Sequence, residues 1–69
     1  MTAKQLIEMA LAYSGKTQKD LALVLNWSPQ LLNNRLKTGK FTIEEWNAIA
    51  KALDAELILA FKFPDGRVV

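Results

Sequence analysis

The chain has 69 residues, and with 51% of them hydrophobic it should bury a small core. That core must suffice for one domain, because the absence of cysteine and histidine excludes disulfides and thiolate or imidazole metal sites. No apolar run, that of residues 57–61 included, is long enough to span a bilayer, and polar residues interrupt the apolar N-terminus. We therefore expect a soluble cytoplasmic protein.

Charge is unevenly distributed along the chain. Residues 1–40 carry six basic and two acidic side chains, a net charge of +4. Residues 41–69 carry three basic and five acidic side chains, a net charge of −2. A basic half beside an acidic half indicates a surface that faces a polyanion, although ordinary solvated charge explains the asymmetry equally well.

The first predicted helix covers residues 2–14 and ends before Gly15, which is suited to the left-handed conformation after a helix. Its core-facing stripe is expected to contain Leu6, Ala10 and Tyr13, with Ile7 and Met9 on the flanks. The second helix begins at the cap Thr17, with Asp20 three residues later in a short-armed capping box. Leu21 and Leu25 should face inward, and Ala22 leaves room for a neighbouring helix to approach closely. The helix should end at Asn26, which tolerates the left-handed conformation.

Two further helices are marked by their starts. Ser28 and Pro29 supply a cap and a first helical residue with a suitable φ. Thr42 and Glu45 form a capping box for a fourth helix over residues 42–53. Two apolar pairs have the spacing of a hydrophobic staple, Trp27 with Leu32 and Phe41 with Trp46. The residues that the fourth helix should bury are Ile43, Trp46, Ile49, Ala50 and Leu53.

After Asp54 the apolar pattern changes to an alternation with period two. Leu57, Leu59, Phe61 and Phe63 form the apolar side of a predicted strand. Residues 64–66, Pro-Asp-Gly, have the composition of a turn, and residues 67–69 are expected to return as a second short strand. We thus predict a mainly α fold, with a helical domain over residues 1–54 and a C-terminal strand or short hairpin over residues 55–69.

The third helix carries an unusual set of amide side chains on one side. At 3.6 residues per turn, Gln30, Asn33 and Asn34 share an arc of roughly 140° with Pro29 and Lys37. Three leucines, Leu31, Leu32 and Leu36, occupy the other side, with Arg35 at the edge of the apolar side. Together with the preceding helix and tight turn this indicates a helix-turn-helix, whose second helix can place amides against adenine in the major groove.

Residues 17–42, TQKDLALVLNWSPQLLNNRLKTGKFT, resemble the helix-turn-helix of the Cro/C1 type, also called the XRE family. The matching features are Thr17-Gln18 at the helix start, Ala22 in mid-helix, the turn before Ser28, and the KTGKFT loop. Arg35 departs from the commonest family pattern, which has an apolar residue there. The resemblance implies a lambda repressor-like fold and binding of operator DNA as a two-fold dimer.

The resemblance also implies roles for individual residues. Those expected to face base edges are Gln30, Asn33 and Asn34. Those expected to contact the DNA backbone are Gln18, Ser28, Lys37, Thr38, Gly39 and Lys40. No catalytic residue, cofactor, metal or small-molecule ligand is expected. The SGKT stretch at residues 14–17 lacks the upstream glycine and preceding strand of a phosphate-binding loop, and no nucleophile–base pair is visible.

An isolated apolar strand is not stable in water, so the C-terminal strand needs a partner surface. It either folds back onto the helical core or pairs antiparallel with its copy across a two-fold axis. We expect the second arrangement, because four helices already cover the core and the strand edge would otherwise stay open. The predicted dimer interface comprises Leu57, Leu59, Phe61 and Phe63.

These features predict a sequence-specific, double-stranded DNA-binding regulator, a dimeric repressor of phage, mobile-element or bacterial origin that acts by occupying a promoter. The alternative is a protein-interaction module on the same fold, such as an antitoxin-like or phage inhibitor protein. That module would use the helix-turn-helix face or the strand edge against a protein. The net charge of +2 is compatible with both, while the amide side with Lys37 and Lys40 favours DNA.

Overall fold

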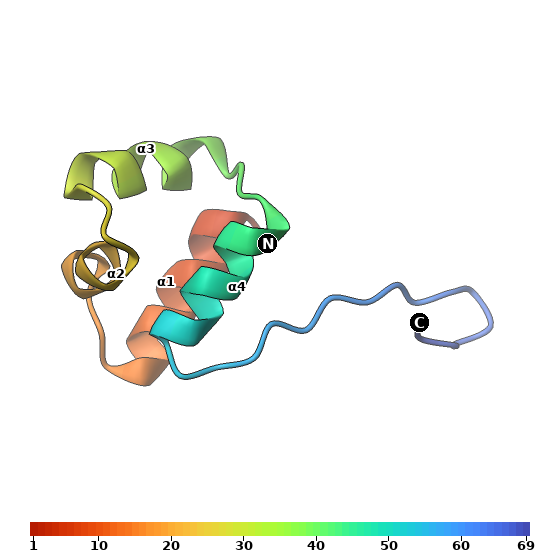
Figure 1. Ribbon diagram of the computed structural model, residues 1–69. Helices are drawn as coiled ribbons and strands as arrows, with labels where there is room; N and C mark the ends of the chain where they lie inside the picture. The colour runs from red at the N-terminus through yellow and green to blue at the C-terminus, as the bar shows by residue number, and fades with distance from the viewer.

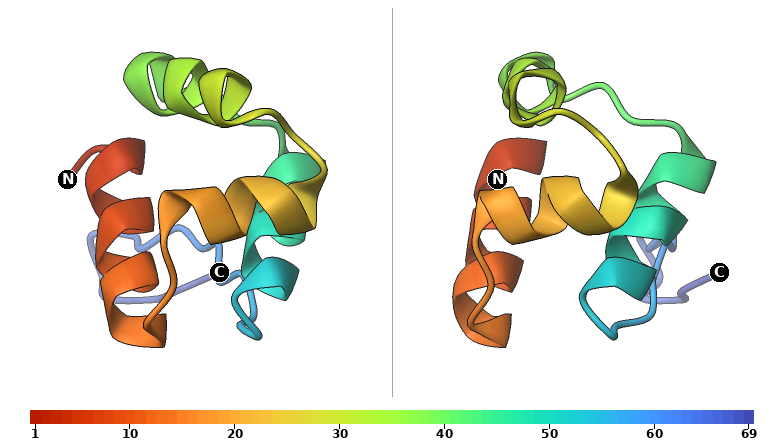
Figure 2. Two further views of the ribbon diagram at one scale, coloured as in Figure 1. Left: turned by 90° about the vertical axis from the view of Figure 1, so that its left-hand side faces the viewer. Right: turned by 60° about the vertical axis from the view of Figure 1, so that its left-hand side comes forward.

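The computed structural model describes residues 1–69 as four short helices followed by an extended C-terminal segment, with no sheet (Figure 1). The helices are α1 (Ala3–Ser14), α2 (Gln18–Leu25), α3 (Pro29–Thr38) and α4 (Ile43–Ala52). Helix α2 lies across one side of α1 and α4, and α3 lies over their upper ends (Figure 2). None of the four helices has the length and apolar character needed to cross a membrane. The four helices and the absence of a sheet confirm the predicted mainly α fold.

Every helix contributes two residues to a single hydrophobic core. Its members are Ile7, Leu11, Leu21, Ala22, Leu32, Leu36, Ile49 and Ala52. Half-buried aromatic residues close the side of the core next to α3 and α4. Phe41 stacks on Trp27, with ring centroids 6.4 Å apart, and tilts against Trp46 at 5.0 Å. This core holds α3 from one side only, so its opposite side stays free.

The helix ends form where the local sequence predicts them. Each N-cap hydroxyl, of Thr2, Thr17, Ser28 and Thr42, accepts a hydrogen bond from the backbone N–H three residues later. Gly15 and Asn26 have the expected left-handed conformation, with φ of 71° and 60°. These devices depend only on neighbouring residues, which explains why they can be recognised without knowledge of the tertiary structure.

The predicted core side of α1 is wrong. Ile7 and Leu11 are buried, at 1% and 4% exposure, whereas Tyr13 is 96% exposed and Leu6 is exposed as well. The helix is apolar around most of its circumference, so its period does not decide which stripe faces the core. The positions of α2 and α3 decide it. Similarly, Ile43 in the first turn of α4 is exposed, and Ala52 is buried in addition to the predicted Ile49.

The predicted strand is not formed as a regular strand within the single chain. Residues 55–69, termed the arm below, run away from the helical body and turn back at their end (Figure 1). Phe61 and Val69 exchange both backbone hydrogen bonds, at 2.8 and 2.9 Å, and Phe63 donates to the carbonyl of Arg67 at 2.8 Å. Around Lys62 and Val68 this makes one isolated antiparallel bridge. A longer strand needs a partner that the single chain does not supply.

Candidate nucleic-acid interface

The amide side chains of α3 lie on its solvent side. Gln30, Asn33 and Asn34, termed the amide face below, are exposed, while Leu32 and Leu36 of the same helix are buried in the core. The buried leucines lie four residues apart, about one turn, and fix the rotation of α3 about its own axis. The amide face therefore points away from the body, as the helical period predicts.

The start of α3 is set by the turn that connects it to α2. The N–H of Trp27 donates to the carbonyl of Ala22 at 2.9 Å, closing the end of α2. Ser28 Oγ then accepts the N–H of Leu31 at 3.1 Å, and Pro29 occupies the first turn of α3. In the first turn of α3 the N–H of Gln30 makes no hydrogen bond within the chain, whereas that of Leu32 donates to the carbonyl of Ser28 at 3.1 Å. Gln18 comes from a different element, as the half-buried first residue of α2.

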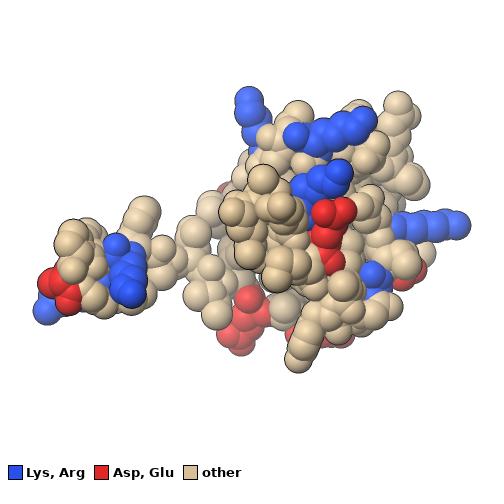
Figure 3. Space-filling model, turned by 180° about the vertical axis from the view of Figure 1, so that it is seen from behind, with Lys and Arg blue, Asp and Glu red and all other residues tan.

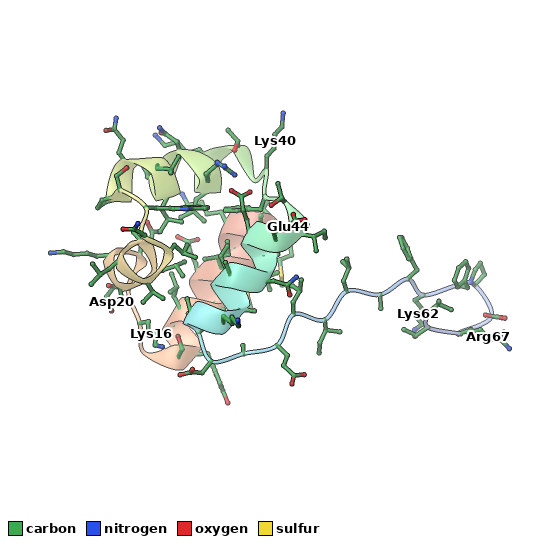
Figure 4. The ribbon with its side chains drawn as sticks, in the orientation of Figure 1. Lys16, Asp20, Lys40, Glu44, Lys62 and Arg67 are labelled. Atoms are coloured by element: carbon green, nitrogen blue, oxygen red, sulfur yellow. The ribbon has the colours of Figure 1, made fainter.

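At the other end of α3, the chain leaves through Gly39 in the left-handed conformation, with φ of 68°. Thr38 Oγ1 donates to the carbonyl of Arg35 at 3.2 Å and accepts the N–H of Lys40 at 3.4 Å. Lys37 and Lys40 are exposed, and Lys40 points away from the body on the side of α3 (Figure 4). Two flexible cations thus lie at the end of the helix that carries the amide face.

Arg35 connects α3 to α4 and to the loop between them. One of its guanidinium nitrogens donates to Glu45 Oε1 at 2.8 Å and to the carbonyl of Lys40 at 3.1 Å. The other lies 2.8 Å from Glu45 Oε2, which completes a bidentate pair. The guanidinium carbon lies 5.3 Å from the centroid of Trp27. Glu45 Oε1 also accepts the N–H of Thr42 at 2.8 Å.

The Arg35–Glu45 pair holds the Lys40 loop against the body. Its hydrogen bond lowers the pKa of Glu45, with the Thr42 N–H as a second cause, and raises the pKa of Arg35. Sequence reasoning placed the stem of Arg35 at the edge of the core but missed this pair. The available signal was a cation at the edge of the apolar side of α3, with an acid ten residues later in the capping box of the next helix.

Positive charge gathers on the side of the molecule that carries α3. Seen from behind, Lys and Arg side chains lie at the top of the body, where α3 is, and Asp and Glu side chains lie lower on the body and on the tip of the arm (Figure 3). The carboxylate of Asp20 is used locally. It accepts the N–H of Thr17 at 3.0 Å, and this hydrogen bond is the main cause that lowers the pKa of Asp20. The exposed cations nearest to the amide face along the chain are Lys37 and Lys40.

The arm residues are not brought to α3. Leu57 is half-buried at the base of the arm, while Leu59 and Phe61 are 72% and 74% exposed. Phe63 is exposed beside the turn.

Comparison of the chain with protein-family models, curated proteins and solved structures gives no match.

Proposed function

We propose that this protein is a sequence-specific, double-stranded DNA-binding regulator, in which α2, the turn and α3 act as a helix-turn-helix of the Cro/C1 type. The observation that carries the proposal is the amide face. Three exposed amides lie on one side of a short helix whose other side is anchored in the core by Leu32 and Leu36. Amides so placed add nothing to the core, yet their paired donor and acceptor suit hydrogen-bond recognition.

The chemistry of these side chains matches the edge of an adenine. Asn and Gln can accept from N6 and donate to N7 at once, which discriminates against a wrong base by about 1–3 kcal/mol per contact. The major groove, about 12 Å wide, admits an α-helix. Gln30 and Asn33 lie nearest the start of α3, the end that approaches the bases in this class of motif. Asn34 extends the same face.

Contacts to the sugar-phosphate backbone would position α3 without specifying sequence. We propose that these contacts come from Gln18 at the start of α2, Ser28 at the start of α3, and Lys37, Thr38, Gly39 and Lys40 at the end of α3. The Arg35–Glu45 pair supports the second group, because Arg35 holds the carbonyl of Lys40. The helical domain, residues 1–54, would therefore supply every contact to DNA.

A two-fold dimer would present two copies of α3 to half-sites about one helical turn apart. The arm would supply the dimer contact through its exposed apolar residues, so that residues 55–69 serve assembly rather than recognition. A dimer of this kind represses by occupying a promoter.

The proposal is tested by selecting binding sites from random duplex DNA with the purified protein at moderate salt. We expect enrichment of a palindromic motif. The Gln30→Ala/Asn33→Ala variant should lose the enrichment while keeping salt-sensitive non-specific binding. The matched control is Gln5→Ala/Asn47→Ala, which removes two exposed amides from α1 and α4 and should select the same motif as the wild type. No enrichment by the wild type would overturn the proposal.

One observation favours a second candidate function, binding to a protein. Leu23 and Val24 form an exposed apolar pair on α2, which a DNA contact would not use. In that case the selected DNA would show no motif, and a variant with Leu23→Ser would lose its protein partner while Gln30→Ala/Asn33→Ala would keep it. A protein-interaction module on the same fold is therefore the alternative function.

A further inference from the structure

The molecule exposes more surface than a compact chain of its size. Its accessible surface is 5493 Å², and its mass is 7.7 kDa. A compact monomer of that mass exposes about 4,300 Å². The radius of gyration is 13.2 Å, against about 11 Å for a compact domain of this length. The excess surface, about 1,200 Å², exceeds the roughly 800 Å² that each partner buries in a standard interface.

Much of this excess lies on the arm, which projects beyond the helical body (Figures 1 and 4). Its exposed apolar side chains are Ile58, Leu59, Phe61, Phe63, Val68 and Val69. Residues 56–60 make no backbone–backbone hydrogen bond. An extended segment that is both apolar and unpaired is suited to pairing with another extended segment.

The short pairing at the end of the arm determines which backbone edge is free. Phe61 and Phe63 direct their bonded groups toward residues 67–69. In an extended chain the backbone N–H and C=O groups of successive residues point to opposite edges. Those of Lys62 therefore point away from residues 67–69, and so do those of Ala60, Ile58 and Glu56. No backbone bond involves Lys62 or any of the other three. The free edge of the arm therefore consists of the even-numbered residues 56–62.

We infer that two copies pair antiparallel along this free edge, about a two-fold axis that passes through Leu59. The inference rests on the proposed dimer and specifies its register. In this register Glu56 lies opposite the partner's Lys62 twice, once on each side of the axis. Leu57 lies opposite the partner's Phe61, and Leu59 lies opposite the partner's Leu59. Apolar residues thus face apolar residues, and each charged residue of the pairing meets an opposite charge.

Neighbouring registers with the same free edge lose these contacts. An axis through Ile58 would place Lys62 opposite the partner's Asp54, which is outside the extended segment. Asp54 has a left-handed φ of 55°, and its N–H already donates to the carbonyl of Lys51 at 3.1 Å. An axis through Ala60 would place Glu56 opposite the partner's Pro64, which has no N–H to donate.

A slip by one residue is excluded by the side-chain alternation. It would place odd-numbered residues opposite even-numbered ones, so that Leu57 would lie beside the partner's Lys62 or Ala60. Each face of the paired arms would then mix apolar and charged residues. Registers that pair odd with odd residues keep Leu57, Leu59 and Phe61 of both copies on one face, and of these only the register centred on Leu59 also places Glu56 opposite the partner's Lys62.

Single cysteines measure the register directly, because the chain has no cysteine of its own. Leu59→Cys should cross-link to its own copy completely under mild oxidation, since residues opposite each other in an antiparallel pair have Cβ atoms about 4.5–5.5 Å apart. Ile58→Cys and Ala60→Cys are the matched controls. Each would lie diagonal to its own copy, about 7–8 Å away, and should stay uncross-linked on a denaturing gel.

Cross-linking of Ile58→Cys or Ala60→Cys instead of Leu59→Cys, with motif selection from DNA intact, would overturn the register and leave the proposed function standing. Failure of all three to cross-link, with a monomer in sedimentation at every concentration, would overturn the arm pairing. All three positions lie on the extended arm and outside the core, so the variants keep a folded helical body.

Charge reversal gives a second measurement. Glu56→Lys and Lys62→Glu each place like charges opposite each other on both sides of the axis, and each should raise the dimer dissociation constant by about tenfold. The double variant Glu56→Lys/Lys62→Glu should restore wild-type dimerisation. Arg67→Glu, on the returning segment, is the control and should leave the dissociation constant unchanged. A double variant no better than either single variant would overturn the pairing.

Discussion

Adjacent residues of α3 perform opposite tasks. Leu32 is 1% exposed and anchors the helix, while its neighbours Leu31, 39% exposed, and Asn33 lie at the surface. The helical period predicts the burial of Leu32 and the exposure of Asn33, because α3 has only one apolar side, but it also assigns Leu31 to that side, where it is only partly covered. In α1 the same reasoning fails, since apolar residues surround that helix and only the packing of α2 and α3 selects Ile7 and Leu11.

At the residue scale, Leu32→Ala should lower the free energy of unfolding by about 2–5 kcal/mol, because it leaves a cavity in the core. The control Leu31→Ala removes the same atoms from a partly exposed position and should cost about 1 kcal/mol or less. Denaturant unfolding followed by tryptophan fluorescence measures both. Equal losses in the two variants would contradict the placement of α3 in the structure.

Lysines at the end of α3 should act on DNA through charge alone. Lys37→Ala and Lys40→Ala should each reduce the slope of log K against log salt by about 1, and weaken binding to all sequences alike. Lys51→Ala, an exposed lysine in the last turn of α4, is the control and should keep the wild-type slope. Loss of motif preference in Lys37→Ala, with the slope unchanged, would count against a backbone contact there.

At the scale of elements, the position of α3 relative to α4 depends on the Arg35–Glu45 pair. The individual helices and their caps follow from local sequence. This contact between helices does not, because an arginine at the edge of an apolar side is compatible with several partners. Arg35 pairs with Glu45, and not with solvent, because the Lys40 loop brings the two helices together.

Glu45→Gln tests the pair through its pH dependence. The folded pKa of Glu45 is lowered, so its contribution to stability is present above the unfolded pKa, about 4.3, and is lost as pH falls through the lower folded value. The wild type should therefore be more stable than Glu45→Gln at neutral pH, and the difference should shrink in acid. Denaturant unfolding at several pH values measures it. A difference that is constant from pH 7 to strongly acidic solution would contradict the pairing.

For the whole molecule, we propose that the helical body serves recognition of DNA and that the arm serves assembly. The alternating pattern predicts the extended conformation of the arm but not its partner, because a strand acquires its pairing from outside its own sequence. In the structure Leu59 and Phe61 are exposed, because nothing within the chain covers them.

A dimer makes thermal stability depend on protein concentration. We expect the Tm of the wild type to rise with concentration, and that of Leu59→Lys to be independent of it. Leu59 is exposed in the single chain, so this variant should keep the helical body intact. Calorimetry over a hundredfold range of concentration measures both. A concentration-independent Tm for the wild type would contradict assembly through the arm.

We propose, above all, that the amide face of α3 is the surface that meets DNA. The most direct test is an NMR titration of the labelled protein with the selected duplex, observing the side-chain amide signals. We predict that the signals of Gln30, Asn33 and Asn34 shift most, and that the signal of Asn47 on α4 does not change. The largest shifts at Asn47 or Gln5, with Gln30 and Asn33 unaffected, would contradict the claim.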